Sequence, residues 1–391
     1  MKILAVAHST DFSGGANRSF FQVVMFLREK HHVDVEVLLP NGEGEMKKRC
    51  LEAHIPVYQM RFHSCCSVFR KEPKDILRMA KLRIYPIVDF LCLLPKIGFF
   101  QNQRYDLIYT NDRLVTIGAE LARLLHLPHI WHIRSFGALN GNTYSRRLEI
   151  LMDRYTEKII AISRAVAEEC ERQYNPEKIQ LIYNGVPFPK QVDHQHHQGY
   201  RLLLTGRLVE DKGQILALQA LKRLNRNRRE KITLTLAGSV PSYDDGKYAR
   251  RLHNFVRENE MKEEVFFAGE VKNMEMLRNQ MDAELICSSN EPFGRVTVEA
   301  MRQQLLVIGS ASGATKELID DGQTGLLFKA GSPEELALKI GFAADHPEES
   351  HRMAMAGYFY SLERFTAEKN AAEIYDTMLN TVRRTKACHE E

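Results

Sequence analysis

The chain has 391 residues, more than one hydrophobic core usually supports, so two domains are expected. Hydrophobic residues make up 44% and charged residues 27%, as in an ordinary globular protein. A formal net charge of +4 argues neither for nor against nucleic acid, but no nucleic-acid partner is expected because no recognised motif gathers cations with aromatic side chains. No uninterrupted apolar run approaches the ~18 residues of a membrane-spanning helix, so no spanning segment is expected.

The N-terminus and the cysteines bear on where the protein works. The first residues, MKILAVAHSTDFSGG, lead from a short apolar run into a glycine loop and not into a signal-peptide cleavage site. The seven cysteines are odd in number and include no C-x-x-C pair, as expected for free thiols in a reducing compartment. We therefore expect a cytoplasmic protein, with peripheral contact at the inner face of the cell membrane as an open alternative.

Short aliphatic runs alternate with helical patterns along most of the chain, which predicts βαβ units and parallel sheets. The first helix is expected over residues 17–28, where apolar side chains recur at helical spacing. A first series of strands is predicted at residues 3–7, 33–39, 107–110 and 159–162. A second series is predicted at residues 202–205, 232–237, 265–268, 285–287 and 306–308. Two doubly wound, Rossmann-like α/β domains in series are the simplest account.

The seam between the two domains is placed at a linker, residues 186–199. Residues 184–189 (NGVPFP) have a composition typical of turns, and the following QVDHQHHQG is polar and almost free of apolar side chains. His194, His196 and His197 could bind a metal there, but a solvated loop is favoured because no other ligand cluster accompanies them. The expected domains are residues 1–185 and 200–360, followed by residues 361–391.

Residues 61–103 differ from the rest of the first domain, because they contain both many cations and many aromatic side chains. The apolar stretch at residues 84–100 is interrupted by Pro86, Asp89, Pro95 and Lys96, so it cannot span a bilayer. Two interpretations remain open. The segment forms helices that pack on the first sheet, or it forms a basic and apolar surface that rests on a membrane interface.

Two features of the first domain favour a ligand. Ser13-Gly14-Gly15 follows the first expected strand and opens the first helix, where glycines let a ligand approach backbone N–H groups. The loop lacks the G-x-G-x-x-G pattern, and Leu39-Pro40 stands where an acidic residue would bind ribose, which argues against a nicotinamide or flavin site. Residues 130–134 (IWHIR) end another strand and are expected to place His132 and Arg134 in a loop facing the same crevice.

In the second domain, residues 202–213 (LLLTGRLVEDKG) read as a strand followed by a glycine and two cations. Arg207 offers a planar fork of donors and Lys212 a compact charge, a combination that suits a diphosphate. Cations at the carboxyl end of a parallel strand face the crevice in which α/β sheets bind ligands. Surface charges in a loop are the alternative interpretation.

Two glutamates separated by seven residues form the sharpest feature, EPFGRVTVE at residues 291–299. Gly294 is expected at a strand-to-helix turn, where backbone N–H groups and the helix dipole favour an anion. Glu299 would lie about one turn into the helix, where its carboxylate can accept hydrogen bonds from a ribose diol. Glu291 would precede the turn, close to the group that lies beyond the phosphates, for which sugar hydroxyls are one candidate. An ordinary helix start with a glutamate in its first turn is the alternative.

Together these motifs resemble the retaining glycosyltransferases of family 4, whose GT-B architecture has two Rossmann-like domains facing a central cleft. Glu291 and Glu299 match the E-x7-E motif of the family, and Gly206, Arg207 and Lys212 match its diphosphate-binding residues. The resemblance covers nearly the whole chain. It includes the glycine loop Gly14-Gly15, the turn at residues 184–186, residues 321–328 (DGQTGLLF) and a C-terminal helix around residues 367–381 that returns to the first domain.

The resemblance implies transfer of a sugar from a nucleoside-diphosphate sugar, with retention, to a glycan or lipid-linked glycan in polysaccharide assembly. The first domain would bind the acceptor and the second the donor, and no metal or separate cofactor is expected because no D-x-D motif stands at a strand end. The catalytic residues would be Arg207, Lys212, Glu291 and His132, the last near the reacting sugar carbon. The remaining donor contacts would be Gly15, Gly206, Val271, Phe293, Gly294, Arg295 and Glu299, and the acceptor side would include Asn17, Arg18 and Arg134.

The sequence departs from the family pattern at three places. Arg295 stands where an aliphatic residue is frequent, Arg302-Gln303-Gln304 replaces small residues, and Ser312-Gly313-Ala314 replaces a glycine pair. None of these removes a catalytic position, so activity is expected. A nucleotide-sugar 2-epimerase and a non-catalytic nucleotide-sugar sensor remain as alternatives. The first needs acid and base residues that the sequence does not identify, and the intact donor motifs argue against the second.

Overall fold

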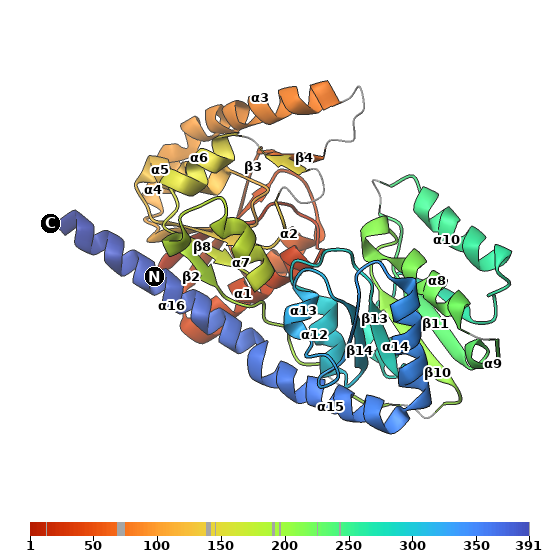
Figure 1. Ribbon diagram of the computed structural model, residues 1–391. Coiled ribbons are helices and arrows are strands. Elements are labelled where there is room, and N and C mark those ends of the chain that lie inside the picture. Colours follow the sequence, from red (N-terminus) through yellow and green to blue (C-terminus); the bar gives the residue numbers. More distant parts are fainter. Residues whose placement is uncertain are drawn as a thin grey trace. The chain divides into compact units, whose positions relative to one another are not determined.

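The computed structural model describes residues 1–12, 14–68, 75–137, 142–144, 146–189, 192–194, 197–224, 226–241 and 244–390. The chain divides into two compact units. Unit 1 comprises Met1–Gly185 and Ala367–Glu391, and unit 2 comprises Val186–Thr366. Each unit is an α/β fold built on one parallel sheet with helices on both faces (Figure 1), so the predicted fold class is confirmed.

Unit 1 contains a seven-stranded parallel sheet in the order β3-β2-β1-β5-β6-β8-β9. Its strands are β1 (Lys2–Val6), β2 (Asp34–Pro40), β3 (Val57–Met60), β5 (Leu107–Asn111), β6 (His129–Ile133), β8 (Lys158–Ala161) and β9 (Ile179–Leu181). A separate antiparallel pair joins β4 (Cys66–Val68) and β7 (Asn142–Tyr144). The helices are α1 (Gly15–His31), α2 (Glu45–Glu52), α3 (Asp75–Leu93), η1 (Leu94–Lys96), α4 (Ile97–Asn102), α5 (Ile117–Leu125), α6 (Arg146–Arg154), α7 (Arg164–Glu171), η2 (Pro176–Lys178) and α16 (Ala367–Glu390).

The sheet of unit 1 is covered by helices on both faces, and alternate residues of each strand point to opposite faces. Ile3 and Ala5 of β1 belong to a core shared with α1, α2 and α16. Leu4 and Val6, between them in sequence, belong to a second core that includes side chains of α3, α4 and α5. The near-continuous aliphatic runs in the sequence reflect this double burial.

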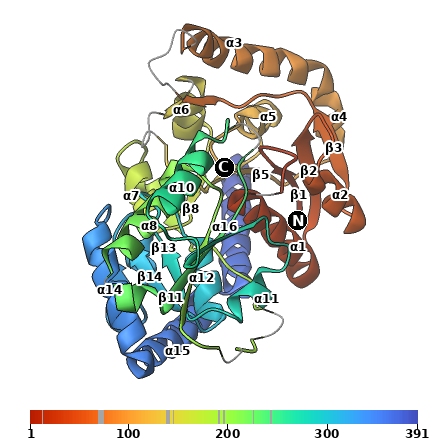
Figure 2. The same cartoon turned by 90° about the vertical axis from the view of Figure 1, so that its right-hand side faces the viewer.

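The C-terminal helix α16 is part of unit 1, although residues 186–366 separate it from the rest of that unit in sequence. Ile374 and Met378 are fully buried in the core that α1 also lines. Tyr375 stacks on His31 of α1 with ring centroids 4.3 Å apart. Figure 2 shows α16 running beside α1. The chain therefore passes from unit 1 to unit 2 and back.

Unit 2 contains a six-stranded parallel sheet in the order β12-β11-β10-β13-β14-β15. Its strands are β10 (Tyr200–Thr205), β11 (Ile232–Ala237), β12 (Val265–Gly269), β13 (Ala283–Ile286), β14 (Leu306–Ser310) and β15 (Leu326–Phe328). The helices are η3 (Glu210–Lys212), α8 (Gln214–Arg223), α9 (Arg226–Arg229), α10 (Lys247–Glu258), α11 (Met274–Arg278), α12 (Arg295–Arg302), α13 (Thr315–Leu318), α14 (Pro333–Asp345) and α15 (Pro347–Arg364).

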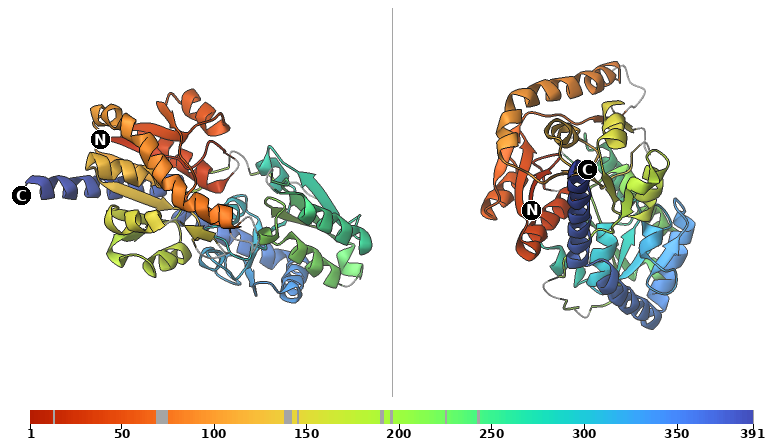
Figure 3. Two further views of the ribbon diagram at one scale, coloured as in Figure 1. Left: turned by 90° about the horizontal axis from the view of Figure 1, so that it is seen from above. Right: turned by 90° about the vertical axis from the view of Figure 1, so that its left-hand side faces the viewer.

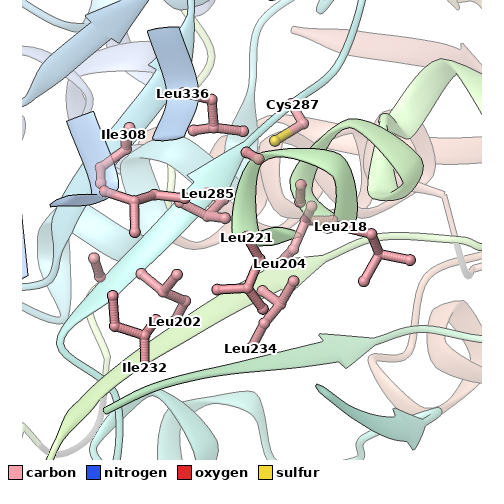
Figure 4. Packing of buried hydrophobic residues seen from close by; sticks show 14 of the residues in the cluster. Leu202, Leu204, Leu218, Leu221, Ile232, Leu234, Leu285, Cys287, Ile308 and Leu336 are labelled. Carbon is pink, nitrogen blue, oxygen red and sulfur yellow. The ribbon is translucent and has the colours of Figure 1, made fainter. Parts of the chain in front are cut away.

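The core of unit 2 again has two sides. On one side, Leu202 and Leu204 of β10 pack with Leu218 and Leu221 of α8, as Figure 4 shows. On the other side, Leu203 packs in a cluster that includes side chains of α12. Because β10 is central and both of its faces are covered, the loop that follows it is anchored on a rigid strand.

The structure describes most of residues 61–103 and of the linker, residues 186–199. Residues 61–103 form β4, α3, η1 and α4, with residues 69–74 outside the described part of the chain. Among the described residues, no helix has both the length and the apolar composition needed to cross a membrane. In the linker, His194 Nε2 lies 2.8 Å from the Gln303 carbonyl oxygen and His197 is only partly exposed, whereas His196 lies outside the described residues. Asp193, His194, Gln198 and Gly199 are exposed, as expected for a solvated loop.

Candidate active site

The order of strands in unit 2 locates a ligand site. β11 and β12 lie on one side of β10, and β13, β14 and β15 lie on the other. The connections therefore run in opposite directions from β10 and β13, and α/β sheets bind ligands beside the carboxyl ends of such strands. The loop after β10 carries Gly206 and Arg207, and the loop after β13 carries Glu291. Both predicted donor motifs meet at this point.

A short ion pair joins the two motifs. Lys212 Nζ lies 2.7 Å from Glu291 Oε2 and 3.5 Å from Ser288 Oγ. The side chains of Lys212 and Glu291 are 25% and 16% exposed, so the pair is partly shielded from water but still accessible. An ammonium held in this way is oriented before a ligand binds, which suits it to an anionic group that approaches the loop.

The two loops touch so closely that only glycine fits between them. Gly213 has φ +70°, and a Cβ there would lie 2.2 Å from the carbonyl oxygen of Cys287. The backbone N–H of Ser289 donates to the Asp211 carbonyl oxygen at 3.1 Å. A left-handed backbone and a close approach both require glycine. The packing of the two loops therefore explains why a glycine follows Lys212.

The loop before α12 presents a helix N-terminus. Gly294 is the N-cap with φ +89°, and no acidic side chain lies in the first turn of α12. Phe293 is buried and packs edge-on against Phe365 with centroids 5.9 Å apart, which fixes the turn. The Thr297 hydroxyl in this turn is buried and has no hydrogen-bond partner among the described residues. Backbone N–H groups at such a terminus favour an anion.

Glu299 is held by two guanidinium groups. Arg295 Nη2 lies 3.4 Å from Glu299 Oε1, and Arg278 Nη2 lies 3.3 Å from Glu299 Oε2. Arg278 is itself buried and donates from Nε to Glu284 Oε2 at 2.8 Å. Burial alone would lower the pKa of the Arg278 guanidinium, but Glu284 and Glu299 together raise it. The sequence identified Arg295 and Glu299, but it gave no sign that Arg278 joins them.

The loop at residues 312–314 supports Glu291 from behind. The Glu291 carbonyl oxygen accepts a hydrogen bond from the backbone N–H of Ala314 at 2.8 Å. A Cβ at Gly313, where φ is +49°, would lie 2.5 Å from that same oxygen. Ser312 Oγ donates to the Ser288 carbonyl oxygen at 2.9 Å. The departure from a glycine pair at this place therefore keeps the one glycine that the packing requires.

The last predicted donor contact, Val271, follows β12 and packs partly buried against the core cluster that α12 lines. Its role towards a nucleotide base stays a prediction.

In unit 1 the equivalent position lies between β1 and β5. Asn111 at the end of β5 places its Nδ2 3.2 Å from His8 Nδ1 and 3.5 Å from Asn17 Oδ1. Asn17 is buried and donates to the Asp11 carbonyl oxygen at 2.7 Å, so its amide holds the glycine loop together. Arg18 is exposed, as is Gly15. The sequence did not single out His8 or Asn111, because neither belongs to a recognisable motif.

His132 and Arg134 lie deeper than expected. His132 is a residue of β6 and not of the loop after it, and its side chain is fully buried. Its Nδ1 lies 2.5 Å from Tyr109 OH, whereas its Nε2 has no hydrogen-bond partner among the described residues. Arg134 follows the strand and donates to Asn111 Oδ1 at 2.6 Å and Asn184 Oδ1 at 2.5 Å. The prediction of a loop position for His132 is corrected here: the IWHIR run is so apolar that its first four residues stay in the sheet.

The buried histidines of unit 1 make stability depend on pH. Burial lowers the pKa of His129 to about 3, and burial followed by the nearby Arg134 charge lowers the pKa of His132 well below 6.5. Below pH 6.5 the unfolded chain therefore binds protons that the folded chain does not, so stability falls as the pH drops towards the folded pKa values. We expect a loss of about 1.4 kcal/mol per pH unit for each such histidine between pH 6.5 and 5.

This expectation is checked by urea unfolding of the full chain at several pH values in that window. His129→Gln should flatten the slope for unit 1, and the exposed His346→Gln should leave it unchanged. A slope of zero in the wild type would contradict the account.

Among the described residues, no group of three or more His, Cys, Asp and Glu side chains is placed to hold a metal ion. Within the same residues no disulfide joins the cysteines. Charged groups that could stabilise an anion in unit 2 gather at the β10 and β13 loops.

Two family models match the chain, one in each half. A family model described as "Glycosyltransferase Family 4" matches residues 13–188, and one described as "Glycosyl transferases group 1" matches residues 190–359. Glycogen synthase of Mycobacterium tuberculosis is 27% identical over 281 residues. The match covers 67% of this chain and 66% of the glycogen synthase, so it spans just under two thirds of that relative. An uncharacterized glycosyltransferase of Methanocaldococcus jannaschii is 25% identical over 328 residues, 82% of this chain and 87% of that protein.

Solved structures show the same fold. Anabaena HepE in complex with UDP has a TM-score of 0.80 at 22% identity, with 97% of this chain and 100% of that chain covered. HepE in complex with UDP-glucose gives a TM-score of 0.77 at 23% identity with the same coverage. At this identity the likeness concerns the fold, which is GT-B. Since the two family models together account for most of the sequence, the chain belongs to glycosyltransferase family 4.

Proposed function

We propose that the protein transfers a sugar from a nucleoside-diphosphate sugar to a glycan or lipid-linked glycan acceptor, with retention at the sugar carbon. The observation that carries the proposal is the Lys212–Glu291 pair, 2.7 Å long, at the carboxyl ends of β10 and β13 beside the N-terminus of α12. A cation, a carboxylate and the backbone N–H groups of a helix N-terminus thus lie together at the position where α/β sheets bind ligands.

The charges suggest how the donor is held. Arg207 and Lys212 would bind the diphosphate, and both would stabilise the negative charge that develops on it as the bond to the sugar breaks. Glu291 would accept a hydrogen bond from a sugar hydroxyl while its second oxygen keeps Lys212 in place. Phe293, Gly294 and Arg295 would offer backbone N–H groups to the same ligand. Gly206, with φ +155°, lets the chain turn sharply after β10.

The reaction we propose needs no separate base from the protein. The bond between the sugar carbon and the diphosphate oxygen breaks, and the acceptor oxygen bonds to the same face of that carbon. The acceptor proton passes to the departing phosphate oxygen, so atoms and charge balance. His132, whose folded-state pKa is lowered by burial, would be neutral at pH 7. Its Nε2, which has no hydrogen-bond partner within the described part of the chain, could then contact the sugar without adding charge.

The transfer itself is tested with purified protein, a panel of nucleotide sugars and simple glycan acceptors. Release of nucleoside diphosphate and the anomeric configuration of the product are followed by NMR, with and without a chelator. Retention that is indifferent to chelator agrees with the proposal. An inverted product, dependence on a divalent metal, or epimerised nucleotide sugar without transfer would each reject it. UDP-glucose is the first donor to try, because HepE was solved with it.

The ribose role of Glu299 gives a separate prediction. Glu299→Ala removes the carboxylate that Arg278 and Arg295 hold, and hydrogen bonds to a charged acceptor contribute about 1.5–3 kcal/mol. We expect nucleoside-diphosphate affinity to fall by roughly 10- to 150-fold, measured by isothermal titration calorimetry. Glu317→Ala, on the neighbouring helix α13, is the control and should bind normally. Unchanged nucleotide affinity in Glu299→Ala would contradict a role of Glu299 in binding ribose.

A further inference from the structure

Among the described residues, helix α3 packs on the rest of unit 1 through one face. Leu82, Pro86 and Leu93 are buried against the unit. The buried Asp89 carboxylate accepts a hydrogen bond from the His63 backbone N–H at 2.9 Å and lies 2.6 Å from His63 Nδ1. These four positions fix the helix in place, and the Asp89 contact keeps it from rotating about its axis.

The opposite face of α3 is also apolar. Ile76, Ile84, Ile87 and Leu91 are 79%, 54%, 61% and 58% exposed, and we call them the outer stripe. With about 100° between successive residues, the four side chains fall within roughly a quarter of the helix circumference. A surface helix normally carries charged residues opposite its buried side. Figure 3 shows α3, in orange, as a long helix on the outside of unit 1.

Cations border the outer stripe. Lys81 and Arg83 are exposed, and helical spacing places them on its two sides. The two carboxylates of α3 are occupied elsewhere, since Asp75 pairs with Arg78 at 2.5 Å and Asp89 is buried. An apolar stripe between two cations, with no exposed carboxylate on the helix, matches a surface of acyl chains and anionic headgroups.

We propose that α3 lies in the plane of an anionic lipid surface, with the outer stripe inserted at the headgroup boundary and Lys81 and Arg83 against lipid phosphates. A second copy of this chain fits the same face less well, because a two-fold pair of α3 helices would bring the like-charged borders of both copies together. The inference goes beyond the proposed sugar transfer and does not rest on it.

Vesicle flotation with the full chain tests the proposal. At low salt we expect the protein to float with vesicles that contain phosphatidylglycerol, and to float far less with pure phosphatidylcholine vesicles. Ile87→Gln/Leu91→Gln should weaken partitioning roughly tenfold or more, since each side chain loses most of its burial in the interface. Lys81→Gln/Arg83→Gln should lose most of the preference for anionic vesicles and most of the salt dependence. Leu338→Gln/Phe359→Gln removes two equally exposed apolar side chains of unit 2 and should float normally.

Several results would overturn the proposal. One is a wild-type protein that ignores anionic vesicles at low salt. Another is undiminished flotation of Ile87→Gln/Leu91→Gln with an unchanged thermal midpoint. A third is a dimer in analytical ultracentrifugation that the same substitutions dissociate, with no vesicle binding, because the outer stripe would then be a contact between copies. Nucleotide binding is measured on each variant. Normal nucleotide binding in a variant that no longer floats shows that the substitution affects the lipid-binding surface and not the donor site.

Discussion

Lys212→Ala is expected to lower kcat/KM for sugar transfer by roughly 10²- to 10³-fold, the usual effect of removing one group that stabilises developing charge. The ammonium of Lys212 is held by Glu291 at 2.7 Å, so it is in place before the donor binds. Negative charge on the diphosphate grows as the sugar leaves, so the interaction is stronger in the transition state than in the ground state. We therefore expect kcat to fall more than nucleotide affinity, measured as diphosphate release under steady-state conditions.

The matched control is Lys247→Ala, which removes an exposed lysine paired with Asp245 at 2.8 Å in the same unit. Its activity should equal that of the wild type. Lys212→Ala also leaves the Glu291 carboxylate without its cation, so the thermal midpoint of each variant is recorded beside the kinetics. If a folded Lys212→Ala protein keeps kcat/KM within about threefold of the wild type, the lysine does not act on the leaving group.

Arg278→Met should destabilise unit 2 by about 3–5 kcal/mol, because removing one partner of a buried ion pair leaves the other charge without compensation. Arg278 Nε donates to Glu284 Oε2 at 2.8 Å, and the Glu284 side chain is completely buried in β13. Urea unfolding is followed with probes in each unit, since a chain of two units need not unfold in one step. The transition of unit 2 should shift, and that of unit 1 should not.

A second substitution separates packing from ligand binding. Arg278→Met/Glu284→Leu replaces the buried pair with apolar side chains, which is often neutral or stabilising, so the stability of unit 2 should return. Glu299 would still lack the contact with Arg278 at 3.3 Å, and nucleotide affinity should remain several-fold lower than in the wild type. Full recovery of affinity in the double variant would show that Arg278 has no part in orienting Glu299.

Local patterns in the sequence predicted most of the fold. Strands such as β10 are buried on both faces, so they read as unbroken aliphatic runs that a single sequence reveals directly. The glycine and cation loop after β10 and the EPFG turn after β13 are local too, because each function depends on residues within about ten positions. The meeting of these loops could be expected from the rule that ligands bind where strand order reverses.

Other features depend on residues far apart in the chain, and no local sequence pattern predicts them. Arg278 and Glu284 read as ordinary surface charges of a short helix and a strand, yet the fold buries both. Asn184 reads as turn chemistry, but its Oδ1 accepts a hydrogen bond from Arg134 Nη1 at 2.5 Å. His132 was expected in a loop because residues 130–134 were interpreted as the end of a strand, but the apolar character of its neighbours keeps it in β6. Tertiary contacts decide such positions.

The central claim is that the β10 and β13 loops of unit 2 bind a nucleoside diphosphate without a metal. The most direct measurement is the thermal midpoint of the wild type and of Lys212→Ala with UDP, GDP, ADP, CMP, dTDP and NAD, each with and without a chelator. A ligand at 100 times its Kd stabilises by about 2.7 kcal/mol, which gives a visible shift. We predict that one nucleoside diphosphate shifts the wild type, that the chelator makes no difference, and that Lys212→Ala responds less. Equal midpoints with every nucleotide would contradict the account.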